Sequence, residues 1–107
     1  MPWYVYPVYF FIGALLANSI PHIVQGVCGN KFQTPFARPR GVGESSAIVN
    51  VVWGFSNVVI AIVLLRVVEV PPPWPVPLWI AVLVGAIALA LYLASRFGKV
   101  RSGAPRP

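Results

Sequence analysis

Three hydrophobic runs, each long enough to cross a lipid bilayer, constrain what this chain can fold into. They cover about residues 3–28, 46–69 and 78–97, and a membrane-spanning helix needs about 20 apolar residues. Backbone polar groups inside a bilayer must be satisfied within the segment, which favours helices. Only 9% of the 107 residues are charged, whereas a soluble domain carries about 25%. The sequence therefore predicts an all-α, polytopic transmembrane protein with three transmembrane helices in a single domain.

The distribution of basic residues predicts which side of the membrane each connection faces. Every Lys and Arg except Arg66 lies in the loop 29–45, at the end of the third run, or in the tail 98–107. Because basic residues gather on the cytoplasmic side of membrane helices, we expect this loop and the tail in the cytoplasm. The N-terminus and the proline-rich hairpin 70–77 are then outside, as in a multi-pass protein of the bacterial inner membrane. Aromatic residues, which membrane interfaces favour, gather on this predicted outer side: Trp3, Tyr4, Trp74 and Trp79.

The net charge of +6 has two explanations, nucleic acid and the membrane surface. Since the basic residues flank hydrophobic runs, membrane lipids are the expected partner and nucleic acid is not. Arg38 and Arg40 are the candidate residues for contact with lipid headgroups. Arg66, on the other side, is expected to pair with Glu69 three residues later.

Glycine and proline mark the breaks between the runs. They recur through the loop 29–45, which is typical of irregular structure. Ser45 or Ser46 is the expected N-cap of the second helix. The first run is longer than a span requires, so we expect it to tilt or to bend at Pro21, which lacks a backbone donor.

Polar side chains interrupt the first two runs with helical spacing. Successive residues of an α-helix are ~100° apart, so polar residues of each run fall on one narrow face. The two helices leave the ends of one loop and run antiparallel, which puts the two faces at matching depth. The expected neighbours are Gly29 with Ser46, Gln25 with Asn50, His22 with Trp53, and Asn18 with Asn57. We call the following six residues the polar seam: Asn18, His22, Gln25, Asn50, Trp53 and Asn57.

The polar seam has a structural and a functional interpretation. Polar residues hydrogen-bond across membrane helices simply to hold them together, but such clusters also mark binding sites and solute paths. We expect a small homo-oligomeric transporter or channel that binds a small polar solute at the seam. The alternative is a non-catalytic accessory or scaffold subunit of a larger membrane complex. Small residues on one face of the third helix favour close packing within the chain or with another protein: Ala81, Gly85, Ala88, Tyr92 and Ser95.

No catalytic, metal or cofactor site is expected. Glu44 and Glu69 are predicted on opposite sides of the membrane, so they cannot form a carboxylate pair, and no nucleophile has an evident base. His22 is the only histidine. Only an oligomer that brought several copies of His22 together would build a haem or metal site. Cys28 is expected to be a small buried residue.

Motifs of two families of small membrane transporters are absent. Half-transporters that dimerise around a proline-containing helix carry a proline–glutamine pair, whereas here Pro21 is followed by His22. Four-helix multidrug exporters carry a glutamate within the first helix, and this first run has none.

Overall fold

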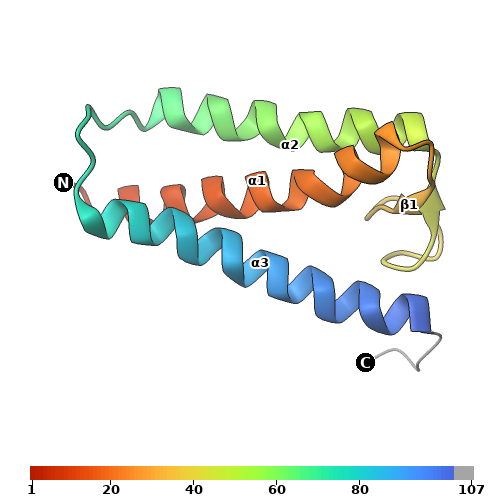
Figure 1. Cartoon of the computed structure of the whole chain (residues 1–107). Coiled ribbons are helices and arrows are strands. Elements are labelled where there is room, and N and C mark those ends of the chain that lie inside the picture. Colours follow the sequence, from red (N-terminus) through yellow and green to blue (C-terminus); the bar gives the residue numbers. More distant parts are fainter. Residues whose placement is uncertain (103–107) are drawn as a thin grey trace.

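The computed structural model describes residues 1–102 as three long helices connected by a short strand pair and a hairpin (Figure 1). Helix α1 covers Val5–Val27, α2 covers Ala47–Val67 and α3 covers Val76–Ser102. Each helix is long and apolar enough to cross a membrane. The prediction of a mostly helical chain with three candidate spans is therefore confirmed. The end of the predicted tail, with Arg106, lies outside the described residues.

Helix α3 is longer than predicted at both ends. It was expected at 78–97, but it begins at Val76 because Pro77 fits the first turn of a helix, where no backbone donor is needed. It continues to Ser102, and its last turn carries Lys99 and Arg101, whose charges are favourable at the negative end of the helix dipole. Part of the predicted tail is therefore helical.

Helix α1 lies between the other two helices and packs extensively against both, whereas α2 and α3 make few if any direct contacts within residues 1–102. Glycines allow the close approach of α1 and α3. A Cβ atom on Gly13 would overlap the carbonyl oxygen of Val82, and one on Gly85 would overlap that of Phe10. The small-residue face of α3 is thus used within the chain at Gly85.

The contact between α1 and α2 also depends on glycine. Gly26 faces the backbone of Ala47, and Gly54 faces the backbone of Ser19. Pro21 lies inside α1 without ending it, and the last turns of α1 rise toward α2 (Figure 1). Toward the same end of the molecule, α3 diverges from α2 (Figure 1). The three helices therefore form a wedge that is widest at the loop between α1 and α2.

The narrow end of the wedge is filled by the hydrophobic core. Tyr9 is fully buried there, and its hydroxyl donates to the carbonyl oxygen of Val68 at 2.8 Å. The ring of Tyr9 packs edge-on against Trp74 at 5.1 Å, and Trp74 Nε1 donates to the carbonyl oxygen of Val70. These contacts hold the proline-rich hairpin against the helices. The other buried residues of this core are Val5, Ile12, Ala61 and Leu78.

The wide end of the wedge is covered by the loop, which is more ordered than predicted. Strands β1 (Phe32–Gln33) and β2 (Glu44–Ser45) pair antiparallel, so the chain is not purely α-helical. The segment from Phe32 to Thr34 is buried, because the loop folds back against the helices instead of extending into solvent. Ser46 caps α2, as predicted, by accepting a hydrogen bond from the backbone of Val49.

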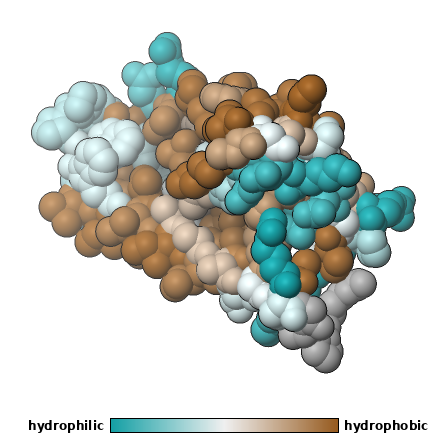
Figure 2. Space-filling model, turned by 45° about the vertical axis from the view of Figure 1, so that its right-hand side comes forward, coloured by the Kyte–Doolittle hydropathy of each residue, from teal (hydrophilic) through white to brown (hydrophobic). Residues whose placement is uncertain are grey.

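Polar and apolar surfaces are separated along the molecule. Figure 2 shows hydrophilic residues over the loop end and hydrophobic residues along the sides of the helices. The contacts of Arg96 with Gly41 and of Arg101 with Gln33 place the end of α3 beside the loop. Arg66 lies at the other end of α2, with its Nε 3.9 Å from the carboxylate of Glu69, as predicted. Both of these side chains are exposed, so the pair contributes little to stability.

Candidate functional site

The first of two side-chain hydrogen bonds between α1 and α2 is made by Asn18 and is supported by a second bond within α2. Asn18 Nδ2 donates to Asn57 Oδ1 at 3.0 Å, and Asn57 Nδ2 donates to the carbonyl oxygen of Trp53 at 2.8 Å. The backbone carbonyl therefore orients Asn57, and Asn57 in turn orients Asn18. The predicted proximity of Asn18 and Asn57 is confirmed.

Asn50 connects the seam to the loop. Its Nδ2 donates to the carbonyl oxygens of Phe32, Ser45 and Ser46 at 3.0–3.1 Å. Its Oδ1 is consequently turned toward His22 Nδ1, 2.8 Å away. Because that oxygen can only accept, Nδ1 of His22 carries the proton and Nε2 is left as an acceptor.

The predicted alignment of the two polar faces holds at Asn18 and Asn57, but the predicted pairing of Gln25 with Asn50 is wrong. Gln25 does not meet Asn50; its Oε1 accepts instead from Asn30 Nδ2 at the exposed end of α1. The reason is that Gly26, not Gln25, lies at the contact with α2. His22 therefore reaches Asn50, while its ring also lies 6.4 Å from that of Trp53.

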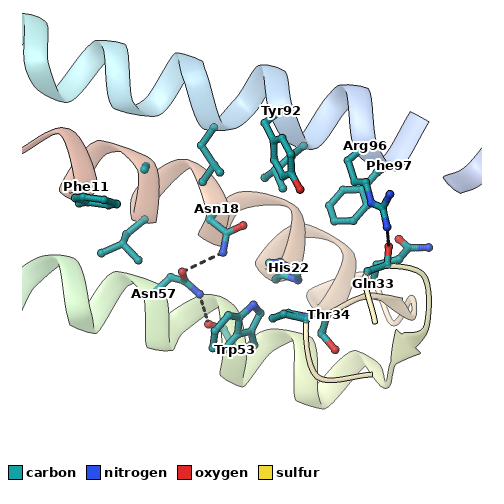
Figure 3. A pocket seen from close by; sticks show the side chains of 16 residues that line it. Phe11, Asn18, His22, Gln33, Thr34, Trp53, Asn57, Tyr92, Arg96 and Phe97 are labelled. Carbon is teal, nitrogen blue, oxygen red and sulfur yellow. Dashed lines mark hydrogen bonds between the residues drawn. The ribbon is translucent and has the colours of Figure 1, made fainter. Parts of the chain in front are cut away.

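A cavity of about 410 Å³ lies beside the seam, in the wide part of the wedge. Figure 3 shows side chains from all three helices and from the loop around it. Its walls are mainly apolar, with polar groups concentrated near the seam and Arg96 toward the loop. Among the residues that line the cavity are Phe11, Leu15, Asn18, His22, Trp53, Leu89 and Arg96.

Three polar atoms of residues that line the cavity have no hydrogen-bond partner within residues 1–102. Among the described residues, Trp53 Nε1 is buried and makes no hydrogen bond. Asn18 Oδ1 and His22 Nε2 also make none there, because the hydrogen bonds of these two side chains use their other polar atoms. A buried donor without a partner costs about 1–3 kcal/mol. The site therefore has two unpaired acceptors and one unpaired donor, and a turn of the Trp53 indole would bring the donor to a bound molecule.

The loop contributes site residues that sequence analysis missed. Phe32 packs edge-on against His22 at 5.4 Å and against Phe97 at 4.9 Å, while Gln33 and Thr34 line the cavity. Phe32 and Phe36 are aromatic residues in a loop rich in basic residues, glycine and proline. These two rings were the feature of the sequence that could have indicated a buried loop segment. Only folding shows that the loop turns back onto the helices.

The remaining candidate residues lie away from the cavity. Arg38 and Arg40 are exposed on the loop, so their contact with lipid headgroups stays a prediction. Cys28 is exposed, contrary to expectation, because it follows the last turn of α1. Residues 1–102 contain no cluster of three His, Cys, Asp or Glu side chains suited to a metal ion.

Comparison with protein-family models, with curated proteins and with solved structures finds no match for this chain.

Proposed function

We propose that this protein is an integral membrane protein, with its basic end in the cytoplasm of a bacterial cell, whose cavity binds a small molecule and exchanges it between the membrane interior and the basic side. The observation that supports this proposal is a cavity next to hydrogen-bonding groups that have no partner within residues 1–102. Its volume of about 410 Å³ falls within the ~300–1,000 Å³ typical of small-molecule sites. Polar groups within a predicted membrane span are costly and often functional.

The cavity favours an amphiphilic ligand over the small polar solute expected from the sequence. Most of its lining is carbon, and a fully polar solute would lose its hydration without regaining enough hydrogen bonds. A molecule with an apolar body and one polar group fits the lining better. The proposal therefore keeps the predicted binding site and changes the class of ligand.

A binding or carrier role is better supported than an open channel. The seam is closed by side-chain hydrogen bonds between α1 and α2. The other end of the wedge is filled by Tyr9, Ile12 and Leu78. An accessory subunit has less support, because the small-residue face of α3 already packs on α1 at Gly85.

Fluorine NMR tests binding directly. The protein is labelled with 5-fluorotryptophan in phosphatidylcholine nanodiscs, and the Trp53 signal is assigned by its loss in Trp53→Phe. We expect 4-bromophenol, an uncharged amphiphile, to shift the Trp53 signal saturably. The signal of Trp74, in the distant hairpin, serves as the internal control.

A pair of variants locates the binding. Ala14 lines the cavity, so Ala14→Phe should fill it and abolish the saturable shift. Ala90 is exposed and does not line this cavity, so Ala90→Phe should preserve the shift. If both Trp signals change linearly with 4-bromophenol in every variant, the probe merely dissolves in the lipid and the proposal is wrong.

A further inference from the structure

The cavity changes in chemical character along its length, which points to a ligand with a defined order of groups. Phe11 lies three turns before His22 on α1, about 16 Å along the helix axis. On α3, Leu89 precedes Arg96 by about 10 Å. All four residues line the cavity, and Figure 3 shows Phe11 and Arg96 toward its opposite ends. An apolar region is thus followed by the polar seam and then by a basic group.

The guanidinium of Arg96 is available to a negatively charged group. Its one hydrogen bond within the described residues is long, 3.5 Å from Nη2 to the carbonyl oxygen of Gly41. No carboxylate lies within 4.0 Å of it in residues 1–102. Arg101, by contrast, lies over the ring of Phe32 at 4.8 Å and contacts Gln33. A guanidinium has five donors and binds carboxylate or phosphate in a bidentate manner.

A ligand group in the middle of the cavity would satisfy the unpaired atoms there if it both donates and accepts hydrogen bonds. Trp53 Nε1 lacks an acceptor, and His22 Nε2 and Asn18 Oδ1 lack a donor. The ring centres of Trp53 and His22 are 6.4 Å apart, so a turn of the indole would bring Nε1 to the same ligand group as His22. A secondary amide supplies an N–H and a carbonyl oxygen, whereas an ester supplies acceptors alone.

We propose that the cavity binds a single-chain acyl amide with an anionic head, the chemical class of an N-acylated amino acid. The head binds Arg96, and the amide N–H donates to His22 or Asn18. The amide oxygen accepts from Trp53 as the indole turns toward the ligand, and the acyl chain lies against Phe11, Leu15 and Leu89. A cavity of about 410 Å³ is near the lower end of the ~300–1,000 Å³ range, which favours one chain over the two of a phospholipid. This inference rests on the proposed function and specifies its ligand.

The test compares ligands that differ by one group in the same fluorine NMR experiment. N-palmitoylglycine carries both the anion and the amide. Palmitoylethanolamide lacks the charge, and the palmitate ester of glycolic acid lacks the N–H. We expect N-palmitoylglycine to bind at least about tenfold more tightly than either, since each removed interaction with a charged or buried group is worth about 1.4 kcal/mol or more.

Two variants, each of which removes one positive charge, test whether Arg96 binds the anionic head of the ligand. Arg96→Gln should abolish the preference for N-palmitoylglycine over palmitoylethanolamide and leave the affinity for palmitoylethanolamide unchanged. Lys99→Gln removes the same charge from an exposed side chain on the same helix, and should retain the preference. An unchanged Trp74 signal verifies that each variant is folded.

The outcomes separate the two proposals. If 4-bromophenol shifts the Trp53 signal saturably but N-palmitoylglycine binds no better than the ester or the uncharged amide, the ligand class is wrong and the binding function stands. If no ligand and no probe shifts the signal saturably, both proposals fail. Loss of the preference in Lys99→Gln as well as in Arg96→Gln would show general charge attraction and overturn the role of Arg96.

Discussion

The side chain of Asn50 makes four hydrogen bonds from a fully buried position, three to carbonyl oxygens at the loop end and one to His22. Its two amide hydrogens are shared among three carbonyl oxygens, so these bonds are weaker than three separate ones. Through these bonds Asn50 joins the strand pair and the first turn of α2 to His22 on α1. It therefore supports the site by holding the loop and His22 in place.

Replacing Asn50 by alanine should destabilise the protein by about 2 kcal/mol, because hydrogen bonds between membrane helices are worth about 0.6 kcal/mol each. Unfolding by SDS in bicelles, followed by helical circular dichroism, measures this loss. Ser56→Ala is the control, since the exposed Ser56 hydroxyl bonds only to the Val52 carbonyl of its own helix. Equal stability of the two variants would contradict the anchoring role of Asn50.

Among the other polar residues of the site, Asn57 is fixed by hydrogen bonds at both ends of its amide, whereas other side chains keep a polar atom without a partner. Asn57 uses both ends of its amide, to Asn18 and to the Trp53 carbonyl. Asn18, His22 and Trp53 each keep one polar atom free. The structural and functional interpretations of the seam are thus compatible, because the same hydrogen bonds that join the helices decide which atoms face the cavity.

The helices owe their arrangement to glycine contacts at different positions along α1. Gly13 and Gly85 bring α1 and α3 together in the half away from the loop, while Gly26 and Gly54 bring α1 and α2 together toward the loop. Since the two contact regions differ, α1 can touch both partners while α2 and α3 separate. The separation leaves the space that the cavity occupies.

Gly85→Ala should lower the stability by about 2 kcal/mol, because a Cβ atom there overlaps the backbone of Phe10 and forces the helices apart. Gly98→Ala is the matched control, since nothing lies within 4 Å of a Cβ atom at that position. Its stability should be unchanged or raised by about 0.5 kcal/mol, the usual gain of alanine over glycine in a helix. The SDS titration described for Asn50 compares the two. A Gly85→Ala protein as stable as Gly98→Ala would show that α1 and α3 do not depend on this contact.

The molecule as a whole has one basic end and one aromatic, proline-rich end. The loop and the last turns of α3 lie together, and Arg66 is at the opposite end of α2. If the basic end faces the cytoplasm, Arg96 lies near the cytoplasmic headgroups and the apolar part of the cavity lies deeper in the membrane. A ligand would then enter head-outward, as lipids are oriented in that leaflet.

Labelling of cysteine tests this orientation. Cys28 is exposed at the basic end, so in bacterial spheroplasts a membrane-impermeant maleimide should label it only after the membrane is opened. A Pro72→Cys variant in a Cys28→Ser background places the thiol in the exposed outer hairpin and should be labelled without opening. The reverse pattern would place the N-terminus and the hairpin in the cytoplasm.

The expected assembly of the chain into a homo-oligomer stays a prediction. The sides of the helices are hydrophobic, which lipid and a second copy would cover equally well. The proposed binding site does not require a second copy, because its donor, its acceptors and Arg96 all come from one chain.

Much of this architecture follows from the sequence, since it depends on local properties. Hydrophobic length sets the three long helices, helical periodicity sets the polar faces, and the antiparallel connection sets which levels of the two faces meet. These rules correctly bring Asn18 to Asn57 and give Ser46 as the cap of α2. They are wrong at Gln25, because Gly26, the next residue on the helix, is the one that faces α2.

The cavity, in contrast, depends on contacts between segments far apart in the sequence. The choice of Gly13 and Gly85 as the crossing point sets the angle at which α3 leaves α1. The return of Phe32 and Thr34 onto the helices closes the wide end and brings the loop to His22. Neither event leaves a periodic pattern, because each results from how surfaces fit after the helices have formed. That is why Arg96 and Phe97 belong to the site although no motif in the chain singled them out.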